Sequence, residues 1–131
     1  MVCLDTSVCV WLLRGTAPKN ARLASRLRVD QTAISTITLA ELVAGAERSE
    51  RRGDELERIE RLCAVRGVWD FDQAAARTAG RVAATLETRG RRLGTADLLI
   101  GSHALSREAA VLTANHAEFE RIPGLEVIRW A

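Results

Sequence analysis

The chain has 131 residues, of which 47% are hydrophobic and 27% charged, and its formal net charge is +2 at pH 7. This length suits one domain with a full core, and the composition excludes an intrinsically disordered chain. The charge is too small for bulk basicity to indicate nucleic-acid binding. Lys19 is the only lysine, so nearly all the positive charge is arginine, which binds phosphate well but here reflects mainly arginine-rich codon usage.

The cysteines and the apolar start of the chain indicate where the protein resides. Cys3, Cys9 and Cys63 are odd in number and lie in apolar surroundings without Cys-x-x-Cys spacing, so we expect reduced thiols in a cytoplasmic protein. The two histidines are not spaced with them as a structural zinc site requires. The apolar start lacks a basic segment and contains Asp5, so we expect neither a signal peptide nor membrane association.

The first predicted element is a short strand over 2–4, because this apolar run suits a strand buried on both faces. Asp5 stands at its carboxyl end, and a helix is predicted over 8–13. Asp5, Thr6 and Ser7 are all good N-caps, and we expect Thr6 to take that role. Because ligands bind at the carboxyl edge of open parallel sheets, Asp5 is a candidate functional carboxylate.

The rest of the chain alternates predicted strands with predicted helices. Strands are predicted over 32–35, 68–71, 110–113 and 125–130. Helices are predicted over 18–29, 36–46, 47–66, 73–88, 95–105 and 115–120, with Asp72 and Thr95 as N-caps and Gly53 as a candidate break. The alternation predicts one α/β domain over 1–131, with a parallel sheet covered on both faces and right-handed crossovers.

Two of the predicted helices are almost wholly apolar, and each carries an isolated carboxylate. Apolar residues surround Glu41 on every side, and such a helix is predicted to be buried. Asp97 lies in the first turn of the helix over 95–105 and shares a face with Gly101 and Ala104. We expect these small residues to bring that helix close to the sheet.

Asp5, Glu41 and Asp97 together predict a cation site. A buried ionised carboxylate costs on the order of several kcal/mol unless it has a partner, and no lysine or arginine is near in the same elements. If the three converge, a divalent cation relieves their repulsion, and oxygen ligands favour Mg²⁺ or Mn²⁺. Asn115 also follows a strand at this edge, where its amide oxygen is suited to a metal-bound water or to weak metal ligation.

Each of these residues also has an ordinary structural interpretation. Asp5 and Asp97 are typical of helix N-termini, Glu41 is free to pair with a distant arginine, and Asn115 is a common turn former. Taken singly, the residues do not decide between the two interpretations. Their joint occurrence favours a functional site.

Four segments resemble, in order, the motifs of PIN-domain ribonucleases. They are DTS at 5–7, ISTITLAEL at 34–42, TADLLI at 95–100 and LTANHAEF at 112–119. More narrowly, TLAEL at 38–42 and FERIPGL at 119–125 resemble the VapC toxins of bacterial toxin–antitoxin pairs. Each motif is short, but together they cover essentially the whole chain.

The resemblance implies a three-layer α/β/α sandwich with a central, mostly parallel sheet, and endonucleolytic cleavage of RNA that depends on Mg²⁺ or Mn²⁺. By position, it makes Asp5, Glu41 and Asp97 the catalytic acids. Asn115 stands where many members have a fourth acid, and asparagine is also common there in the VapC group. Two polar positions of the family that support the acids or a bound water are Ser7 and Thr113.

The mechanism we expect is hydrolysis by a metal-activated water. The cation, held by Asp5 and Asp97, polarises the scissile phosphate and lowers the pKa of its water, while Glu41 orients or activates water. The products then carry 5′-phosphate and 3′-hydroxyl ends. The resemblance also implies a cognate VapB-type antitoxin, a homodimer, and operator DNA contacted only through the antitoxin, with the helical regions over 47–66 and 73–88 as candidate surfaces.

Substrate binding is expected to involve arginines that flank the predicted site. These are Arg14, Arg89, Arg91 and Arg92. A simple solvated loop remains the alternative for the last three. The tryptophans are expected in the core or at a dimer contact.

The alternative function is a catalytically silent PIN-like binding or regulatory module within a DNA-binding toxin–antitoxin complex. Phosphoryl-transfer and receiver domains are less favoured, because this sequence lacks their motifs.

Overall fold

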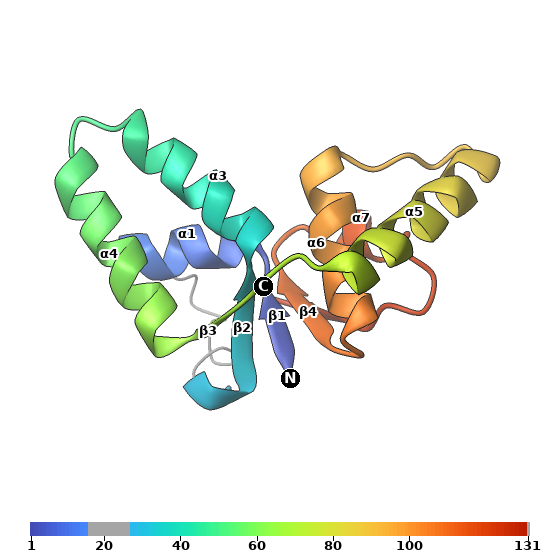
Figure 1. Ribbon diagram of the computed structural model, residues 1–131, viewed down its shortest axis with the longest axis horizontal. Helices are drawn as coiled ribbons and strands as arrows, with labels where there is room; N and C mark the ends of the chain where they lie inside the picture. The colour runs from blue at the N-terminus through green and yellow to red at the C-terminus, as the bar shows by residue number, and fades with distance from the viewer. Residues whose placement is uncertain (16–26, 131) are drawn as a thin grey trace.

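The computed structural model describes residues 1–15 and 27–130, in which strands alternate with helices (Figure 1). The strands are β1 (Val2–Leu4), β2 (Thr32–Ser35), β3 (Gly67–Trp69), β4 (Ala110–Thr113) and β5 (Val127–Arg129). The helices are α1 (Thr6–Arg14), α3 (Thr36–Glu47), α4 (Arg52–Val65), α5 (Gln73–Thr88), α6 (Thr95–Ser106) and α7 (His116–Phe119), and a 3₁₀ turn, η1 (Val29–Gln31), precedes β2.

The five strands form one parallel sheet in the order β3-β2-β1-β4-β5. The central strand β1 pairs with β2 and β4, so that Val2 is aligned with Thr32 on one side and with Ala110 on the other. Both neighbours and β1 itself are buried along their whole length. The parallel sheet predicted from the alternation of elements is confirmed, and the carboxyl ends of all five strands meet at one edge.

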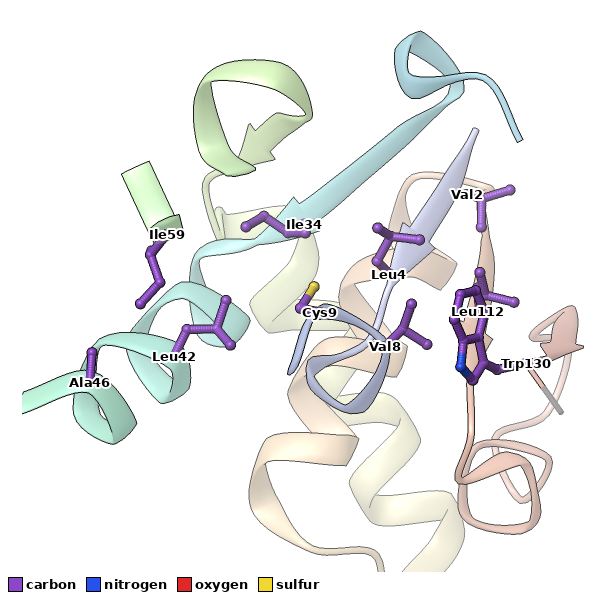
Figure 2. Close-up of a cluster of buried hydrophobic side chains, with 10 residues drawn as sticks. All are labelled: Val2, Leu4, Val8, Cys9, Ile34, Leu42, Ala46, Ile59, Leu112 and Trp130. Atoms are coloured by element: carbon purple, nitrogen blue, oxygen red, sulfur yellow. The ribbon is translucent and has the colours of Figure 1, made fainter. Parts of the chain in front are cut away.

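Helices cover both faces of the sheet, which makes the predicted α/β/α sandwich (Figure 1). Alternate residues of one strand point to opposite faces. Accordingly, Leu4 and Leu112 pack with α1, α3 and α4 in one core (Figure 2). Cys3 and Val111 pack with α5, α6 and the segment around α7 in the other. Local alternation in the strands thus decides which helix layer each side chain meets.

Two tryptophans are part of the core, as expected. Trp130 is fully buried and stacks on Trp11, with ring centroids 5.7 Å apart. Trp69 lies in the edge strand β3, where the Arg107 guanidinium stands 4.4 Å from its ring centroid. This contact is a cation–π interaction that shields the ring at the sheet edge.

The three cysteines are free thiols, and two of them are fully buried. Burial raises the pKa of the Cys3 thiol to about 12 and also raises the pKa of Cys9 and of the partly buried Cys63. Such thiols are protonated at neutral pH and therefore poor nucleophiles. In the described part of the chain, no helix has the length and apolar character to cross a membrane.

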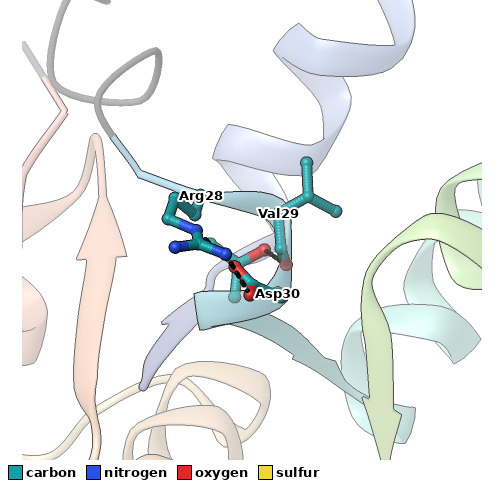
Figure 3. A network of polar contacts seen from close by, with 4 residues as sticks. Arg28, Val29 and Asp30 are labelled. Atoms are coloured by element: carbon teal, nitrogen blue, oxygen red, sulfur yellow. Dashed lines mark hydrogen bonds and ion pairs between the residues drawn. The ribbon is translucent and has the colours of Figure 1, made fainter.

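The start of β2 is fixed by polar contacts around η1 (Figure 3). The Thr32 hydroxyl donates to the Val29 carbonyl at 2.8 Å and accepts from the Arg66 guanidinium at 2.8 Å. Arg28 and Asp30 form an exposed ion pair at 2.9 Å. An exposed pair of this kind contributes less than about 1 kcal/mol, so the Thr32 contacts are the more important ones.

The prediction that α3 is buried on all sides is wrong. Only one side of the helix is buried, through Thr38, Leu42 and Ala46. The opposite side is exposed and carries Ala40, Glu41, Ala44 and Gly45. Because its apolar residues are small, leaving them in water costs little, and an apolar composition therefore did not require burial.

Helix ends match the predictions in one case and differ in two. Asp72 caps α5 through its side chain, as predicted. Gly94, and not Thr95, precedes α6, and it offers no side-chain cap. The charged region after α3 is broken at 48–51 rather than at Gly53, which lies in the first turn of α4.

Element boundaries differ most near the strand ends. The helix predicted over 18–29 falls largely outside the described residues, and its last residue instead begins η1. The strands predicted over 68–71 and 125–130 are shorter, since only Gly67–Trp69 and Val127–Arg129 pair with a neighbour. Edge strands have one partner, so pairing stops earlier than the apolar pattern suggests.

A buried histidine joins the two helix layers, and sequence reasoning gave it no role. His103 of α6 has no exposed surface, and its Nδ1 lies 2.8 Å from the hydroxyl of Ser35. That hydroxyl also accepts the Ile37 backbone N–H at 3.1 Å and so caps α3. The imidazole packs against Trp69 and Phe71, with ring centroids 5.9 and 5.3 Å apart.

We predict that His103 makes the protein less stable in mild acid. Burial lowers the pKa of His103 below its ordinary 6.5, with Arg107 adding to the effect and Asp70 and Asp72 opposing it. The unfolded chain therefore binds the proton at higher pH than the folded protein does. Below about pH 6.5 the free energy of unfolding falls as pH falls, by at most about 1.4 kcal/mol per pH unit.

The measurement is urea denaturation of the native protein and of His103→Asn at about pH 7.5 and pH 5.5. The variant keeps a polar group for Ser35 but cannot titrate, so its free energy of unfolding should change less between the two conditions. Equal changes in both proteins would contradict a buried neutral imidazole.

A second stability prediction concerns Gly101, which was expected to bring α6 close to the sheet. Helix α6 does pack against β4, and at Gly101 itself the close approach is to α7 and the residues after it. An added Cβ there would overlap Ile122 and stand 3.1 Å from Phe119. Gly101→Ala should therefore lower the free energy of unfolding by about 1–3 kcal/mol, because overpacking outweighs the better helix propensity.

Gly80 in α5 is the matched control for this substitution. An added Cβ at Gly80 meets nothing within 4 Å, so Gly80→Ala should raise the free energy of unfolding by up to about 1 kcal/mol. Urea denaturation of both variants measures the two effects. If both substitutions shift the midpoint in the same direction, the packing argument at Gly101 is wrong.

Candidate active site

Asp5 is held at the carboxyl edge of the sheet by the strand that it follows. Its backbone N–H donates to the Leu112 carbonyl at 3.0 Å, which extends the pairing of β1 with β4 by one residue. Its carboxylate accepts hydrogen bonds from the Ser7 backbone N–H and from the Thr113 hydroxyl. The side chain thereby caps α1, so the expectation that Thr6 would do so is wrong.

The Asp5 carboxylate is almost completely buried, with 4% of the residue exposed. Burial raises the pKa of Asp5 above its ordinary 3.8, the hydrogen bonds from Thr113 and Ser7 oppose this rise, and the charge of Glu41 adds to it. None of the ion pairs formed by residues 1–15 and 27–130 involves Asp5. The structure thus buries a carboxylate that has hydrogen-bond donors but no cationic partner among the described residues.

Asp97 lies in the first turn of α6 and is about half-buried. Burial raises its pKa, and the charges of Asp5, Glu118 and Glu41 raise that pKa further. The Asn115 side-chain amide donates to Asp97 Oδ2 at 3.3 Å and partly opposes the rise. The predicted proximity of Asn115 to this acid is therefore present.

Glu41 reaches the same site from α3, although it is exposed rather than buried. Its Oε1 accepts a hydrogen bond from the Thr6 hydroxyl at 2.6 Å. No arginine or lysine of the described residues pairs with it, which removes the alternative of a distant arginine partner within that part of the chain. Its charge contributes to the raised pKa of both Asp5 and Asp97, so Glu41 lies within electrostatic range of the other two acids.

Ser7 and Thr113 lie beside Asp5, where the family resemblance put supporting polar residues. The Thr113 hydroxyl, besides donating to Asp5, accepts the Asn115 backbone N–H at 2.8 Å. The Ser7 hydroxyl accepts the Ala114 backbone N–H at 3.4 Å. These contacts join the residues after β4 to the first turn of α1, and so they set Asn115 at the sheet edge.

Two residues of the site were not predicted from the sequence. Thr6 was assigned to capping but binds Glu41 instead. Glu118 lies near enough to raise the pKa of Asp97, and it also pairs with Arg121 at 3.3 Å. The available signal for Glu118 was its position one helical turn after Asn115, a spacing that places both on one side of a short helix.

The arginines predicted to bind RNA occupy two different places. Arg14 lines a cavity of about 290 Å³ between α1, α3 and α4, whose wall also includes Thr6, Glu41 and Arg58. The exposed loop before α6 carries the others: Arg89, Arg91 and Arg92. Arg92 stands 3.5 Å from Glu87, and none of the hydrogen bonds of this described loop reaches the acids.

The donor set of the site fits a hard divalent cation. Asp5 and Asp97 supply carboxylate oxygens, and burial and neighbouring acids raise the pKa of both carboxyl groups. Neither residue forms an ion pair with a described residue. Such oxygens are the ligands that Mg²⁺ and Mn²⁺ prefer. Among residues 1–15 and 27–130, no three His, Cys, Asp or Glu side chains are near enough to hold one ion by themselves, so water would complete such a site.

The family model described as PIN domain matches residues 2–125. The chain is 37% identical over 128 residues to the tRNA(fMet)-specific endonuclease VapC of Shigella flexneri, covering 98% of this chain and 96% of that protein. It is 32% identical over 128 residues to Ribonuclease VapC2 of Rickettsia felis, covering 97% of this chain and 96% of that protein.

Solved structures agree with this relationship. The crystal structure of DNA-bound VapBC from Salmonella typhimurium has a chain that is 36% identical, with a TM-score of 0.91 and coverage of 99% of this chain and 98% of that one. VapBC2 from Rickettsia felis, bound to a DNA fragment from its promoter, has a chain that is 30% identical, with a TM-score of 0.90 and complete coverage of both chains. The chain therefore belongs to the PIN-domain family and, within it, to the VapC ribonucleases.

Proposed function

We propose that this protein is an RNA-cleaving toxin that hydrolyses phosphodiester bonds and is inhibited by a VapB-type antitoxin. The observation that carries the proposal is a set of hydrogen bonds at the carboxyl edge of the sheet. They link Asp5 through Thr113 and Asn115 to Asp97. Glu41 joins this set through Thr6, the residue after Asp5. The relatives support it, because they are named as a tRNA(fMet)-specific endonuclease and a ribonuclease, and the solved complexes are of VapBC.

In this proposal the cation is Mg²⁺ or Mn²⁺, and Asp5 and Asp97 hold it. When bound, it neutralises charge on the scissile phosphate and lowers the pKa of a coordinated water. The hydrogen bonds from Thr113 and Ser7 fix the orientation of the Asp5 carboxylate, and Asn115 does the same for Asp97.

Glu41 has a different role in this proposal. Glu41 is the most exposed of the three acids and therefore the most open to solvent, and it orients or deprotonates the attacking water. The ribose 2′-hydroxyl then takes no part in the reaction. The silent-module alternative is disfavoured, because all three acids are present and the charge of Glu41 acts on the ionisation of the other two.

The partners in this proposal are an RNA substrate, a VapB-type antitoxin and a second copy of the chain. Operator DNA is contacted through the antitoxin, in line with the solved VapBC complexes that contain DNA. A cytoplasmic location accords with free thiols that are buried or partly buried.

We predict that Asp5→Asn lowers RNA cleavage at least about a hundredfold while the fold is kept or stabilised. Asparagine caps α1 as well as aspartate does, and it removes a buried charge. The folded-state pKa of Asp5 is raised, so ionisation of Asp5 lowers stability at neutral pH, and the stability advantage of the variant should shrink as pH falls through that pKa.

The measurements are cleavage of structured RNA by purified protein with Mg²⁺, and urea denaturation at neutral and acidic pH. Asp30→Asn is the matched control, because Asp30 is exposed in η1 and its ion pair among the described residues is with Arg28. Cleavage that persists in Asp5→Asn would point to a contaminating nuclease or to a different site. Products with 2′,3′-cyclic phosphate ends, rather than 5′-phosphate and 3′-hydroxyl ends, would reject attack by water.

We predict that the exposed arginines before α6 bind the RNA backbone. Replacing Arg91 and Arg92 together with alanine should weaken RNA binding and reduce the slope of log affinity against log salt by about one for each phosphate that the protein no longer binds. Binding of a fluorescent RNA at several salt concentrations measures the affinity and its salt dependence. Arg77→Ala, at an exposed position of α5, is the control. If both variants bind RNA with the same affinity and the same salt dependence, the loop before α6 is exposed to solvent without binding RNA.

A further inference from the structure

The Thr6 hydroxyl connects the start of α1 to the Glu41 carboxylate. Thr6 is the first residue of α1 and directly follows Asp5. Its Oγ1 donates to Glu41 Oε1 at 2.6 Å and lies 3.3 Å from the Thr38 hydroxyl. Asp5 itself caps α1, so the Thr6 hydroxyl is not needed for capping and is free to bind across to α3.

The proton count fixes the direction of these two contacts. An ionised carboxylate only accepts hydrogen bonds, and a hydroxyl has one proton to give. The Thr6 proton therefore goes to Glu41, and the contact with Thr38 requires the proton of Thr38. Thr38 is fully buried and lies three residues before Glu41 on α3, so a chain of hydroxyls runs from α3 to α1 and returns to the carboxylate.

Among the described residues, Thr6 is the one whose hydrogen bond holds the Glu41 carboxylate. Glu41 lies on the exposed side of α3, and none of the ion pairs among the described residues holds it. A hydrogen bond from a hydroxyl to a carboxylate is charge-assisted and stronger than one between neutral groups. Threonine suits the task, because its branched Cβ leaves the hydroxyl few χ1 positions.

This contact places the Glu41 carboxylate at the end of α1 that Asp5 caps. Thr6 adjoins Asp5 in sequence, so a carboxylate bound to Thr6 is brought to the amino-terminal end of α1. The charge of Glu41 acts on the ionisation of Asp5 and Asp97, which agrees with this placement.

We propose that Thr6 is a positioning residue for RNA cleavage: its hydroxyl holds the Glu41 carboxylate at the end of α1 beside Asp5, where Glu41 acts on the attacking water. This inference rests on the proposed function and adds to it a residue that does not touch the substrate or the reacting atoms. The Thr6 side chain thus replaces an ion pair as the means of fixing an exposed catalytic carboxylate.

The activity test compares Thr6→Val, which keeps the shape but removes the hydroxyl, with Thr6→Ser, which keeps the hydroxyl. Thr6→Val should lower kcat for RNA cleavage about tenfold or more with little change in KM, and Thr6→Ser should restore most of it. Thr38→Val should have a smaller effect, because Thr6 keeps its proton for Glu41. Thr85→Val in α5, where the hydroxyl donates to the Arg81 carbonyl, is the control for losing a threonine hydroxyl elsewhere.

A double-mutant cycle separates positioning from a general structural effect. In a Glu41→Ala background, Thr6→Val should cause no further loss of kcat, because the partner of the hydroxyl is gone. An equal loss of kcat in both backgrounds would overturn the inference. Failure of Thr6→Ser to restore kcat would overturn it as well.

A second readout does not depend on activity. In the metal-free protein, the ¹³C resonance of the Glu41 carboxyl carbon should shift in Thr6→Val but not in Thr85→Val or Thr6→Ser. If the native protein cleaves no RNA, the proposed function fails, and the catalytic part of this inference fails with it. If the native protein cleaves RNA while Thr6→Val keeps both its kcat and the Glu41 resonance, positioning by Thr6 alone is refuted.

Discussion

The pairing of β1 with β4 is the constraint on which the site depends. The register aligns Leu4 with Leu112, so the residue after β1 and the last residue of β4 meet at the carboxyl edge. Those residues are Asp5 and Thr113, and the hydroxyl of one donates to the carboxylate of the other. Because parallel strands fix register through a ladder of backbone hydrogen bonds, a slip of one residue would turn Asp5 toward a face of the sheet and separate it from this donor.

The site contains carboxyl groups whose ionisation is disfavoured by their surroundings in the fold. Asp5 and Asp97 both have raised pKa values from burial, and each is raised further by neighbouring carboxylates. Hydrogen bonds from backbone, hydroxyl and amide groups compensate only part of this cost. A cluster of acids kept close together without described basic partners is costly for stability, and it is what binding of a divalent cation to carboxylates would require.

Side chains from both helix layers are needed to assemble the acids. Glu41 comes from α3 on one face of the sheet and Asp97 from α6 on the other. His103 connects these two helices, because it sits on α6 and binds the Ser35 hydroxyl that caps α3. A buried polar contact as well as apolar packing thus connects α3 with α6.

The sequence by itself determined the features that depend on near neighbours in the chain. Apolar runs predicted the strands, Asp72 predicted the start of α5, and the alternation of elements predicted a parallel sheet with Asp5 and Asp97 at its carboxyl edge. Four ordered motifs predicted the family. These signals are local, because strand burial, helix capping and the place of a residue after a strand are fixed within a few positions.

Only the tertiary structure decided which residues of distant segments contact one another. An apolar circumference predicted that α3 is buried, yet Glu41 is exposed, because neighbouring elements cover only one side of that helix. The binding of Glu41 by Thr6 joins residues 35 positions apart, and the effect of Glu118 on Asp97 joins α7 to α6. No periodicity within one segment encodes such contacts, since they depend on which helix faces meet once the sheet has formed.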